Sequence, residues 1–189
     1  MCIKNTLKNF LSYFVRILLV DLYIAYYQHF RHLMDKIIIY TDGSSRGNPG
    51  RGGFGAILMW NGKVKEIAEA YRNTTNNRME LLGVIKALLQ LKTKKLPVHI
   101  YTDSKYIVDS VQKKWLDNWI KTDFKGGKKN KDLWIQYHQL AATLTIHFEW
   151  VKGHADNPYN NRCDELATLA ADNGPWNIDE EFEKNELAK

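Results

Sequence analysis

The sequence predicts a mixed α/β fold, in which helices cover a sheet that contains both parallel and antiparallel strands. Two short apolar runs rich in β-branched residues, at 37–40 and 98–101, are typical of buried strands. Two further strand-like segments are joined by Asn61 and Gly62, a pair that favours the tight turn of a hairpin. Apolar residues at helical spacing after Glu80 predict a helix that packs against these strands.

The expected elements follow one another in an order that one mixed sheet accommodates. The stretch from Ser44 to Gly53 is rich in glycine and has the chemistry of a turn after the first strand. Strands are expected at 37–40, 54–60, 63–71, 98–101 and 146–150. Helices are expected at 80–91, 105–111, 114–121, 131–143 and 162–171.

Composition and charge fit one domain that binds an acidic partner. The chain has 189 residues, 44% of them hydrophobic, which is enough for one domain with a sizeable core. Its formal net charge of +6 favours an acidic partner, with nucleic acid as the first candidate. The end of the chain reverses this trend, since Asp179 to Lys189 holds five acidic and two basic residues. We expect an acidic, solvated tail at 176–189.

The cysteines indicate the compartment. Cys2 and Cys163 lie far apart in sequence, so a disulfide framework is not expected and a reducing, cytoplasmic location fits. No cluster of cysteine and histidine has the spacing of a zinc site. A monomer is the default expectation.

The first thirty-three residues differ from the rest of the chain. They are rich in aromatic residues, but Arg16 and Asp21 interrupt the apolar run, which is too short for a membrane-spanning helix. Arg16 also argues against a signal peptide. We interpret 1–33 as an extension outside the catalytic unit, favour Met34 as the native start, and expect the catalytic domain at 34–175. No membrane association is expected.

Four carboxylates carry the candidate chemistry. Asp42 and Asp103 each follow an apolar strand within the repeated tripeptide Tyr-Thr-Asp, so neighbouring parallel strands would bring them to one sheet edge. Glu80 and Asp164 lie on the inward faces of two helices, near helix N-termini where the dipole favours negative charge. Each acid alone is more typical of a turn or a helix cap. Four acids at one point would repel each other unless Mg²⁺ or Mn²⁺ neutralised them.

Five motifs, from about Met34 to Asp172, resemble type I ribonuclease H of the bacterial form. They are YTDGSSRGNPGRGGFGAIL, TTNNRMELLGVIKAL, YTDSKYI, a Trp/Lys-rich segment, and WVKGHADNPYNNRCDELA. The resemblance implies a ribonuclease H-like fold with a five-stranded mixed sheet, whose second strand is antiparallel to the others. It implies hydrolysis of the RNA strand of an RNA–DNA hybrid, with 5′-phosphate and 3′-hydroxyl products. It also implies that two Mg²⁺ ions are held by Asp42, Glu80, Asp103 and Asp164.

The resemblance also implies roles for other residues. His154, in a loop between Gly153 and Pro158, is expected beside the metals, for proton transfer or for product release. The segment from Lys113 to Trp134, with seven lysines and interleaved aromatics, is expected to grip the DNA strand without reading its sequence. The expected substrate-binding residues are Asn48, Thr75, Asn76, Asn77, Lys105, Asn118, Trp119, Lys125, Lys128 and Lys129. Of these, Thr75, Asn118 and Trp119 match the site that holds a DNA phosphate in the family.

Three alternative interpretations stay open. A non-catalytic hybrid-binding domain of the same fold would normally lack one or more of the four acids, and all four are present. A resolvase or integrase core would lack the GNPG turn together with the Trp/Lys segment. A detached segment of a reverse transcriptase would need polymerase sequence upstream, and 1–33 contains none.

Overall fold

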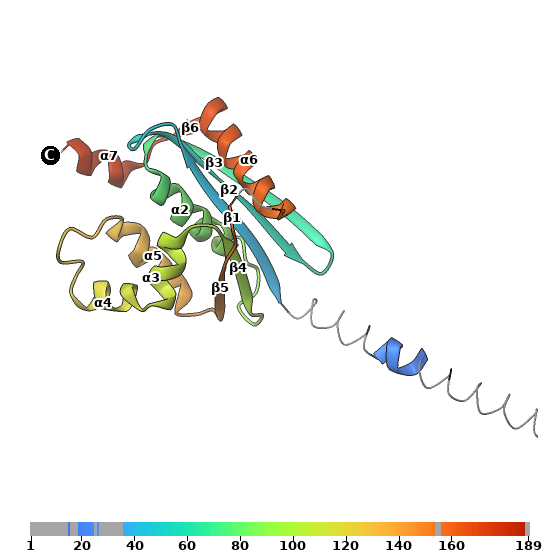
Figure 1. The fold of residues 1–189 in the computed structure, drawn as a ribbon. Helices are drawn as coiled ribbons and strands as arrows, with labels where there is room; N and C mark the ends of the chain where they lie inside the picture. The colour runs from blue at the N-terminus through green and yellow to red at the C-terminus, as the bar shows by residue number, and fades with distance from the viewer. Residues whose placement is uncertain (1–14, 16–18, 25, 27–35, 154–155, 188–189) are drawn as a thin grey trace, which may run out of the picture. The chain divides into compact units, whose positions relative to one another are not determined.

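The computed structural model describes residues 15, 19–24, 26, 36–153 and 156–187. The chain divides into two compact units, Met1–Asp35 and Lys36–Lys189, which are described separately (Figure 1). In the first unit the described residues are helical and exposed. The other residues of 1–33, to which the expectations above also apply, lie outside the described residues. Within the described parts of the chain, no helix has both the length and the apolar character needed to cross a membrane.

The second unit is built on a six-stranded sheet in the order β5-β4-β1-β2-β3-β6 (Figure 1). The strands are β1 (Ile37–Ser45), β2 (Gly50–Trp60), β3 (Lys63–Thr74), β4 (Val98–Thr102), β5 (Ile146–Trp150) and β6 (Trp176–Asn177). Neighbouring strands are parallel except that β2 is antiparallel to both β1 and β3. The expected antiparallel second strand is therefore confirmed, and the short β6 raises the strand count from the expected five to six.

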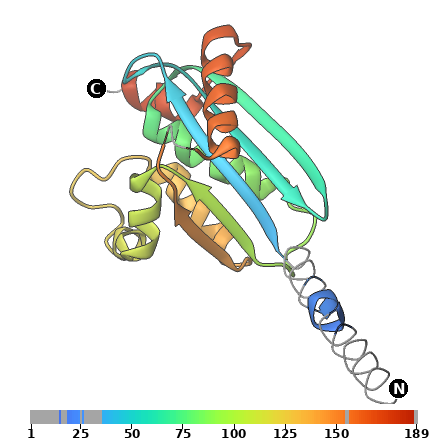
Figure 2. The ribbon, with the colours of Figure 1, turned by 45° about the vertical axis from the view of Figure 1, so that its right-hand side comes forward.

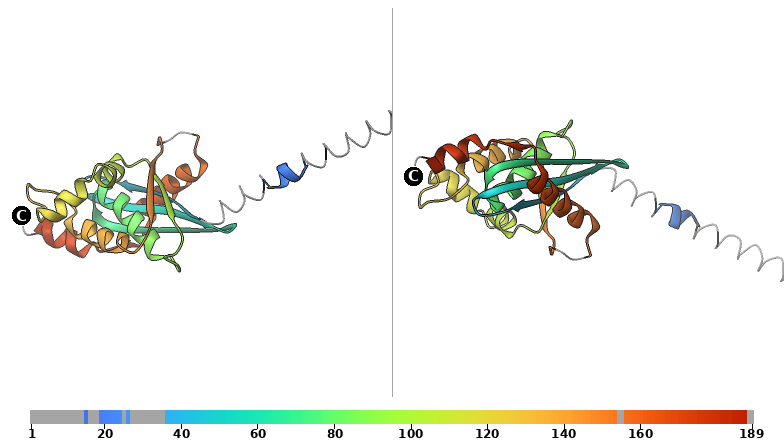
Figure 3. Two further views of the ribbon diagram at one scale, coloured as in Figure 1. Left: turned by 90° about the horizontal axis from the view of Figure 1, so that it is seen from below. Right: turned by 90° about the horizontal axis from the view of Figure 1, so that it is seen from above.

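Helices cover both faces of this sheet. The helices are α2 (Asn76–Leu89), α3 (Lys105–Gln112), α4 (Trp115–Lys121), α5 (Lys131–Ala141), α6 (Pro158–Asn173) and α7 (Glu180–Leu187). In Figure 2, α6 lies in front of the sheet and α2 behind it, and Figure 3 shows the layers from below and above. α2 packs on β1 and β2, while α6 packs on β1, β2 and β3.

The main core lies on the side of the sheet covered by α2, α3 and α5. Ile39 of β1 and Ile100 of β4 are fully buried, as expected from their apolar runs. Trp134 of α5 is also fully buried, and its indole N–H donates a hydrogen bond of 2.6 Å to the Tyr106 hydroxyl. This satisfied donor lets a large aromatic ring serve as core without an unpaired polar atom.

The first strand is longer than its apolar run predicts. β1 does not end at Tyr40 but continues to Ser45, because its last residues pair with the glycines at the start of β2. The register sets Ser44 opposite Gly53 and Ser45 opposite Gly52. The glycine-rich turn expected from Ser44 to Gly53 is therefore only partly a turn, since strands occupy both of its ends.

Two helices begin earlier than their apolar periodicity predicts. α2 begins at Asn76 after an extended Thr75, rather than at Glu80. α6 begins at Pro158 rather than at Arg162, since the Asn157 side chain accepts hydrogen bonds from the first backbone N–H groups. Neither helix has an acid in its first turn. The expected dipole stabilisation of Glu80 and Asp164 is consequently wrong.

The end of the chain is folded rather than wholly solvated. Trp176 of β6 pairs with Ala70 of β3, and its indole N–H donates to the Ala171 carbonyl at 3.0 Å. Asp179, expected in a solvated tail, is only 8% exposed and forms an ion pair with the buried Arg78. The acidic composition of this segment does not reveal that Asp179 pairs with an arginine far away in the sequence, and this explains why a solvated tail was expected.

The second unit should fold without the first. A chain that starts at Met34 keeps all of β1 and should unfold cooperatively with the melting temperature of the full chain. A chain that starts at Ile39 loses Ile37, which is buried and paired with Val98, and should melt at a lower temperature. Thermal melts followed by circular dichroism measure both. Loss of cooperative unfolding in the Met34 variant would show that residues 1–33 belong to the fold.

Candidate active site

Two of the four acids meet because their strands are parallel neighbours. β1 and β4 pair with Tyr40 opposite Tyr101, and the two tyrosine rings stack at 4.8 Å on one face of the sheet. Asp42 and Asp103 each lie two residues further along, so alternation puts their side chains on that same face. The expectation that the repeated Tyr-Thr-Asp motifs meet at one sheet edge is confirmed. Asp103 follows β4 as expected, whereas Asp42 lies inside β1.

Glu80 reaches this edge because Gly43 has no side chain. A Cβ at Gly43 would overlap the backbone of Met79 and Glu80, so the helix can approach the strand only at a glycine. The Glu80 carboxylate is then held from two sides. The Asn76 amide donates to Oε1 at 2.9 Å, and the Ser104 hydroxyl donates to Oε2.

Asp164 reaches the same edge through a second glycine. Gly55 of β2 lies opposite Asp42 in the β1–β2 ladder. A Cβ at Gly55 would overlap the carbonyl oxygen of Cys163, so α6 packs directly on the strand at this point. Asp164 is the next residue of α6, and its charge is one of those that act on Asp42. Asp103, Asp164 and Glu80 thus all lie near enough to Asp42 for their negative charges to act on it.

Burial and mutual repulsion raise the pKa of two of these acids. Asp42 is 7% exposed, and its pKa is raised to about 8, mainly by burial and then by the negative charges of Asp103, Asp164 and Glu80. The Gly43 N–H donates to Asp42 Oδ1 at 2.7 Å, which opposes this shift. Burial also raises the pKa of Glu80 to about 7, against the lowering effect of its two hydrogen-bond donors.

The donor set fits a hard divalent cation. Among the described residues, no three acid, histidine or cysteine side chains lie closely enough together to enclose an ion. The four carboxylates nevertheless supply only hard oxygen donors, and the pKa values of Asp42 and Glu80 are raised first by burial and then by neighbouring negative charge, which a cation would offset. A cation bound by these acids would stabilise their charged forms.

Three further residues support the acids, and residue-by-residue analysis of the sequence missed them. Ser104 also accepts a hydrogen bond from Ile107 N as the N-cap of α3, which is a local signal that could have been recognised. The Trp150 indole N–H donates to the Asp103 carbonyl at 3.0 Å. Gly153 lies so close that a Cβ would overlap the Asp103 carboxylate. His154, the next residue, lies outside the described residues.

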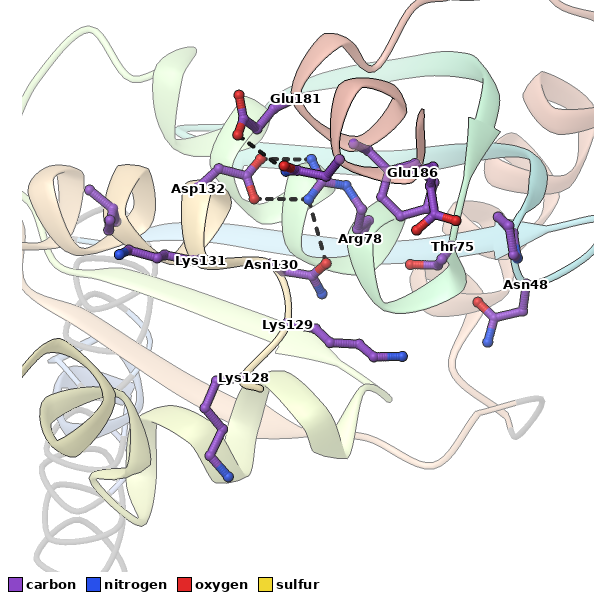
Figure 4. Close-up of a pocket in the computed structure, with 14 residues that line it drawn as sticks. Asn48, Thr75, Arg78, Lys128, Lys129, Asn130, Lys131, Asp132, Glu181 and Glu186 are labelled. Carbon is purple, nitrogen blue, oxygen red and sulfur yellow. Dashed lines mark hydrogen bonds and ion pairs between the residues drawn. The ribbon is translucent and has the colours of Figure 1, made fainter. Parts of the chain in front are cut away.

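A pocket of about 730 Å³ collects several residues expected to bind substrate (Figure 4). It is lined by Asn48, Thr75, Lys128 and Lys129, among others. A second pocket of about 500 Å³ is lined by Lys113, Lys114, Trp115, Asn118, Trp119 and Lys128. Thr75 and Asn118, expected at one phosphate site, thus line separate pockets that share Lys128.

The predicted binding residues differ in how far they are exposed. Trp119 is 9% exposed and packs its ring against Phe124 and Trp134, so most of this side chain is core. Asn76 is engaged with Glu80, as described above. Asn77, Lys105, Asn118 and Lys125 are exposed, and the Lys105 ammonium lies 5.1 Å from the Trp150 ring centre.

Solved structures assign the fold class. The chain is similar to LC9-RNase H1, described as a type 1 RNase H, at 30% identity and a TM-score of 0.65, over 73% of this chain and 72% of that one. It is also similar to LC11-RNase H1 in complex with an RNA/DNA hybrid, at 30% identity and a TM-score of 0.56, over 72% of this chain and 97% of that one. The fold and the acid cluster thus define a ribonuclease H-like α/β protein, which confirms the predicted fold class.

Sequence relatives give the family. A family model described as RNase H matches residues 34–172. Ribonuclease H of Chlorobium luteolum is 48% identical, over 76% of this chain and 100% of the relative. Ribonuclease H of Clostridium botulinum is 46% identical, over 74% of this chain and 97% of the relative. The chain belongs to the ribonuclease H family and is a hydrolase of the endonuclease type, as its motifs predict.

Stability without metal should depend on pH through these acids. The pKa of Asp42 is about 8 in the folded protein against an ordinary value of 3.8, so the folded state binds a proton more tightly than the unfolded state. In excess chelator, the free energy of unfolding should fall as the pH rises from about 4 to about 8, by up to about 1.4 kcal/mol per pH unit. Asp42→Asn should reduce this slope and stabilise the protein near neutral pH.

Urea unfolding at a series of pH values measures the effect. Mg²⁺ in place of chelator serves as the control, because a bound cation should stabilise wild type near neutral pH and flatten its profile. An equally steep fall in Asp42→Asn and wild type in chelator would contradict the assignment of this charge crowding to Asp42.

Proposed function

We propose that this chain hydrolyses the RNA strand of RNA–DNA hybrids with two divalent metal ions and leaves 5′-phosphate and 3′-hydroxyl ends. The observation that carries the proposal is the convergence of Asp42, Glu80, Asp103 and Asp164 at one sheet edge in a member of the ribonuclease H family. A non-catalytic hybrid-binding domain is disfavoured, because such a domain has no need to bear the repulsion among four acids.

In the proposed mechanism the four acids would hold the ions, with Mg²⁺ as the expected metal and Mn²⁺ as a substitute. When bound, the ions supply activation of the attacking water and stabilisation of the departing 3′ oxygen. Asn76 and Ser104 orient the Glu80 carboxylate through hydrogen bonds to its two oxygens. The Trp150 indole N–H holds the Asp103 turn through its hydrogen bond to the Asp103 carbonyl, and Gly153 leaves room for the Asp103 carboxylate. His154 is proposed to assist proton transfer or product release.

Hybrid recognition is proposed to use two surfaces beside the acids. Asn48, Asn76 and Asn77 come from the turn after β1 and the start of α2, and an amide can both donate to and accept from a 2′-hydroxyl. Lys125, Lys128 and Lys129 are exposed in the loop between α4 and α5 and are suited to contact DNA phosphates. The solved complex of LC11-RNase H1 with an RNA/DNA hybrid supports this choice of substrate.

The proposed setting is a bacterial-type cytoplasm, with the protein as a monomer. The described cysteine, Cys163, is a free and buried thiol, which fits a reducing compartment. Sedimentation of the full chain tests the oligomeric state.

Neutral substitutions of the acids should abolish cleavage while the fold is kept. Asp42→Asn should lower the cleavage rate in Mg²⁺ by roughly 10³-fold or more, because metal ions supply several kcal/mol of transition-state stabilisation. Asp103→Asn and Glu80→Gln should follow closely, and Asp164→Asn should be milder. Glu165→Gln is the matched control. Glu165 is the exposed neighbour of Asp164 and pairs with Arg162, so this variant should cleave hybrid at the wild-type rate.

The assay compares labelled hybrid, duplex DNA and duplex RNA with each variant. Wild type should cut only the RNA strand of the hybrid and should stop in excess chelator. Full activity of Asp42→Asn, or cleavage by wild type in chelator, would rule out the metal-ion mechanism. Cleavage of duplex DNA at a similar rate would rule out the proposed substrate.

Replacing the basic loop should weaken binding without slowing the chemical step. Lys125→Ala, Lys128→Ala and Lys129→Ala together should raise the Michaelis constant for hybrid. They should also reduce the slope of log affinity against log salt by about 0.9 for each phosphate that is no longer neutralised. Lys92→Ala, Lys94→Ala and Lys95→Ala remove the same charge from the loop between α2 and β4 and should change little. A fall in turnover at saturating hybrid with an unchanged salt slope would contradict this role.

A further inference from the structure

The turn between β1 and β2 carries Asn48, one of the residues proposed to contact a 2′-hydroxyl. The turn is closed by a hydrogen bond of 2.6 Å from the Arg46 N–H to the Arg51 carbonyl. Asn48 lies between these two residues, is exposed, and lines the pocket drawn in Figure 4. The contacts that fix this turn therefore also fix where Asn48 meets a bound strand.

Two arginines attach this turn to the end of α6 and to β6. The Arg46 guanidinium donates from Nε to Asp172 Oδ1 at 2.6 Å and from Nη2 to Asp172 Oδ2 at 2.7 Å. The Arg51 guanidinium lies 4.3 Å from the centre of the Trp176 ring. Trp176 is itself held by the hydrogen bond of its indole N–H to the Ala171 carbonyl. Both ends of the turn are therefore attached to one short segment of the chain.

The ion pair between Arg46 and Asp172 also connects the turn to the acid cluster. Asp172 lies on α6, the helix that carries Asp164. The pKa of the Arg46 guanidinium is raised, mainly by its hydrogen bonds to Asp172 and further by the negative charge of Asp164. The helix that supplies one of the four acids thus also sets the position of the turn that carries Asn48.

This ion pair should affect the turn more than the stability of the fold. The side chains are 44% exposed for Arg46 and 46% exposed for Asp172. Ion pairs at such exposure contribute little to the free energy of unfolding. A two-point contact between a planar guanidinium and a carboxylate nevertheless fixes orientation as well as distance. Its main effect is therefore local, on the conformation of the turn.

We infer that Arg46 and Asp172 are positioning residues, which hold Asn48 in place for the RNA strand of the hybrid. With the pair formed, the turn is ordered before the hybrid arrives, so binding does not have to order it. Without the pair, binding must order the turn and affinity falls, while the four acids are unchanged. This inference rests on the proposed function, because it assumes that Asn48 contacts the RNA strand.

Removal of the Asp172 charge tests the positioning role. Asp172→Asn keeps the shape of the side chain and should raise the Michaelis constant for hybrid about threefold to tenfold, the equivalent of ordering one or two side chains. Turnover at saturating hybrid should stay close to wild type. Binding to duplex DNA, which has no 2′-hydroxyl, should change much less than binding to hybrid. Asp172→Glu keeps the carboxylate and should retain most of the affinity.

Glu66→Gln is the matched control. Glu66 accepts hydrogen bonds of 3.0 and 2.9 Å from Arg162, and both side chains are 39% exposed, so this pair resembles the pair under test. It joins α6 to β3 instead of to the turn, so its loss should leave the Michaelis constant unchanged. The melting temperatures of Glu66→Gln and Asp172→Asn should both stay close to that of wild type.

A direct contact between Arg46 and a phosphate makes the opposite prediction. In that case Asp172→Asn would release Arg46 toward the nucleic acid and tighten binding to hybrid and to duplex DNA alike. Fluorescence anisotropy in an Asp42→Asn background, in which the hybrid stays intact, measures affinity. Cleavage kinetics of the same variants in the active chain measure turnover and the Michaelis constant.

Weaker hybrid binding in Asp172→Asn, with Asp172→Glu and Glu66→Gln close to wild type, supports the positioning role. Unchanged or tighter binding, an equal loss in Glu66→Gln, or a fall in turnover with an unchanged Michaelis constant overturns it. The proposed function still stands in each of these cases if wild type cleaves hybrid. A wild-type chain that neither binds nor cleaves hybrid overturns both.

Discussion

Repulsion among four carboxylates at one sheet edge is the constraint on which the rest of this structure depends. The acids come from β1, α2, α6 and the turn after β4, and the proposed function requires each of them to approach the others closely enough to hold metal ions. Two glycines make this possible, since Gly43 admits α2 and Gly55 admits α6 at distances that a methyl group would prevent. The pKa values of Asp42 and Glu80 are raised mainly by burial, and neighbouring acids add to both shifts.

The same constraint explains why the supporting residues are polar. Ser104 and Asn76 donate to Glu80, and the Gly43 N–H donates to Asp42, so each buried acid receives part of the compensation that water would otherwise supply. These donors orient the carboxylates without neutralising them. A neutralising lysine or arginine would stabilise the fold, but it would also compete with the cation that the chemistry requires.

Local motifs make the positions of the acids predictable. Much of the remaining structure depends on contacts between segments that are distant in sequence, and local motifs do not predict these contacts. Asp42 and Asp103 follow apolar runs whose repetition predicts parallel neighbours, and the structure confirms their meeting. Apolar periodicity misplaces the starts of α2 and α6, because Thr75 and Asn157 begin these helices ahead of their apolar faces. Trp119 is expected at a phosphate site, but most of its side chain is core. The sequence does not separate these two roles, because apolar packing and nucleic-acid contact both favour a tryptophan.

Arg78 shows what sequence patterns cannot supply. It stands two residues before Glu80 in a motif that marks the family, yet its partners Asp132 and Asp179 lie far along the chain. Through them it ties α2 to the start of α5, next to the basic loop, and to the acidic C-terminal segment. One buried guanidinium thus connects three segments of the chain around a single pocket. The net charge of +6 therefore says little about affinity for a polyanion, because the placement of each charge along the path of the duplex decides it.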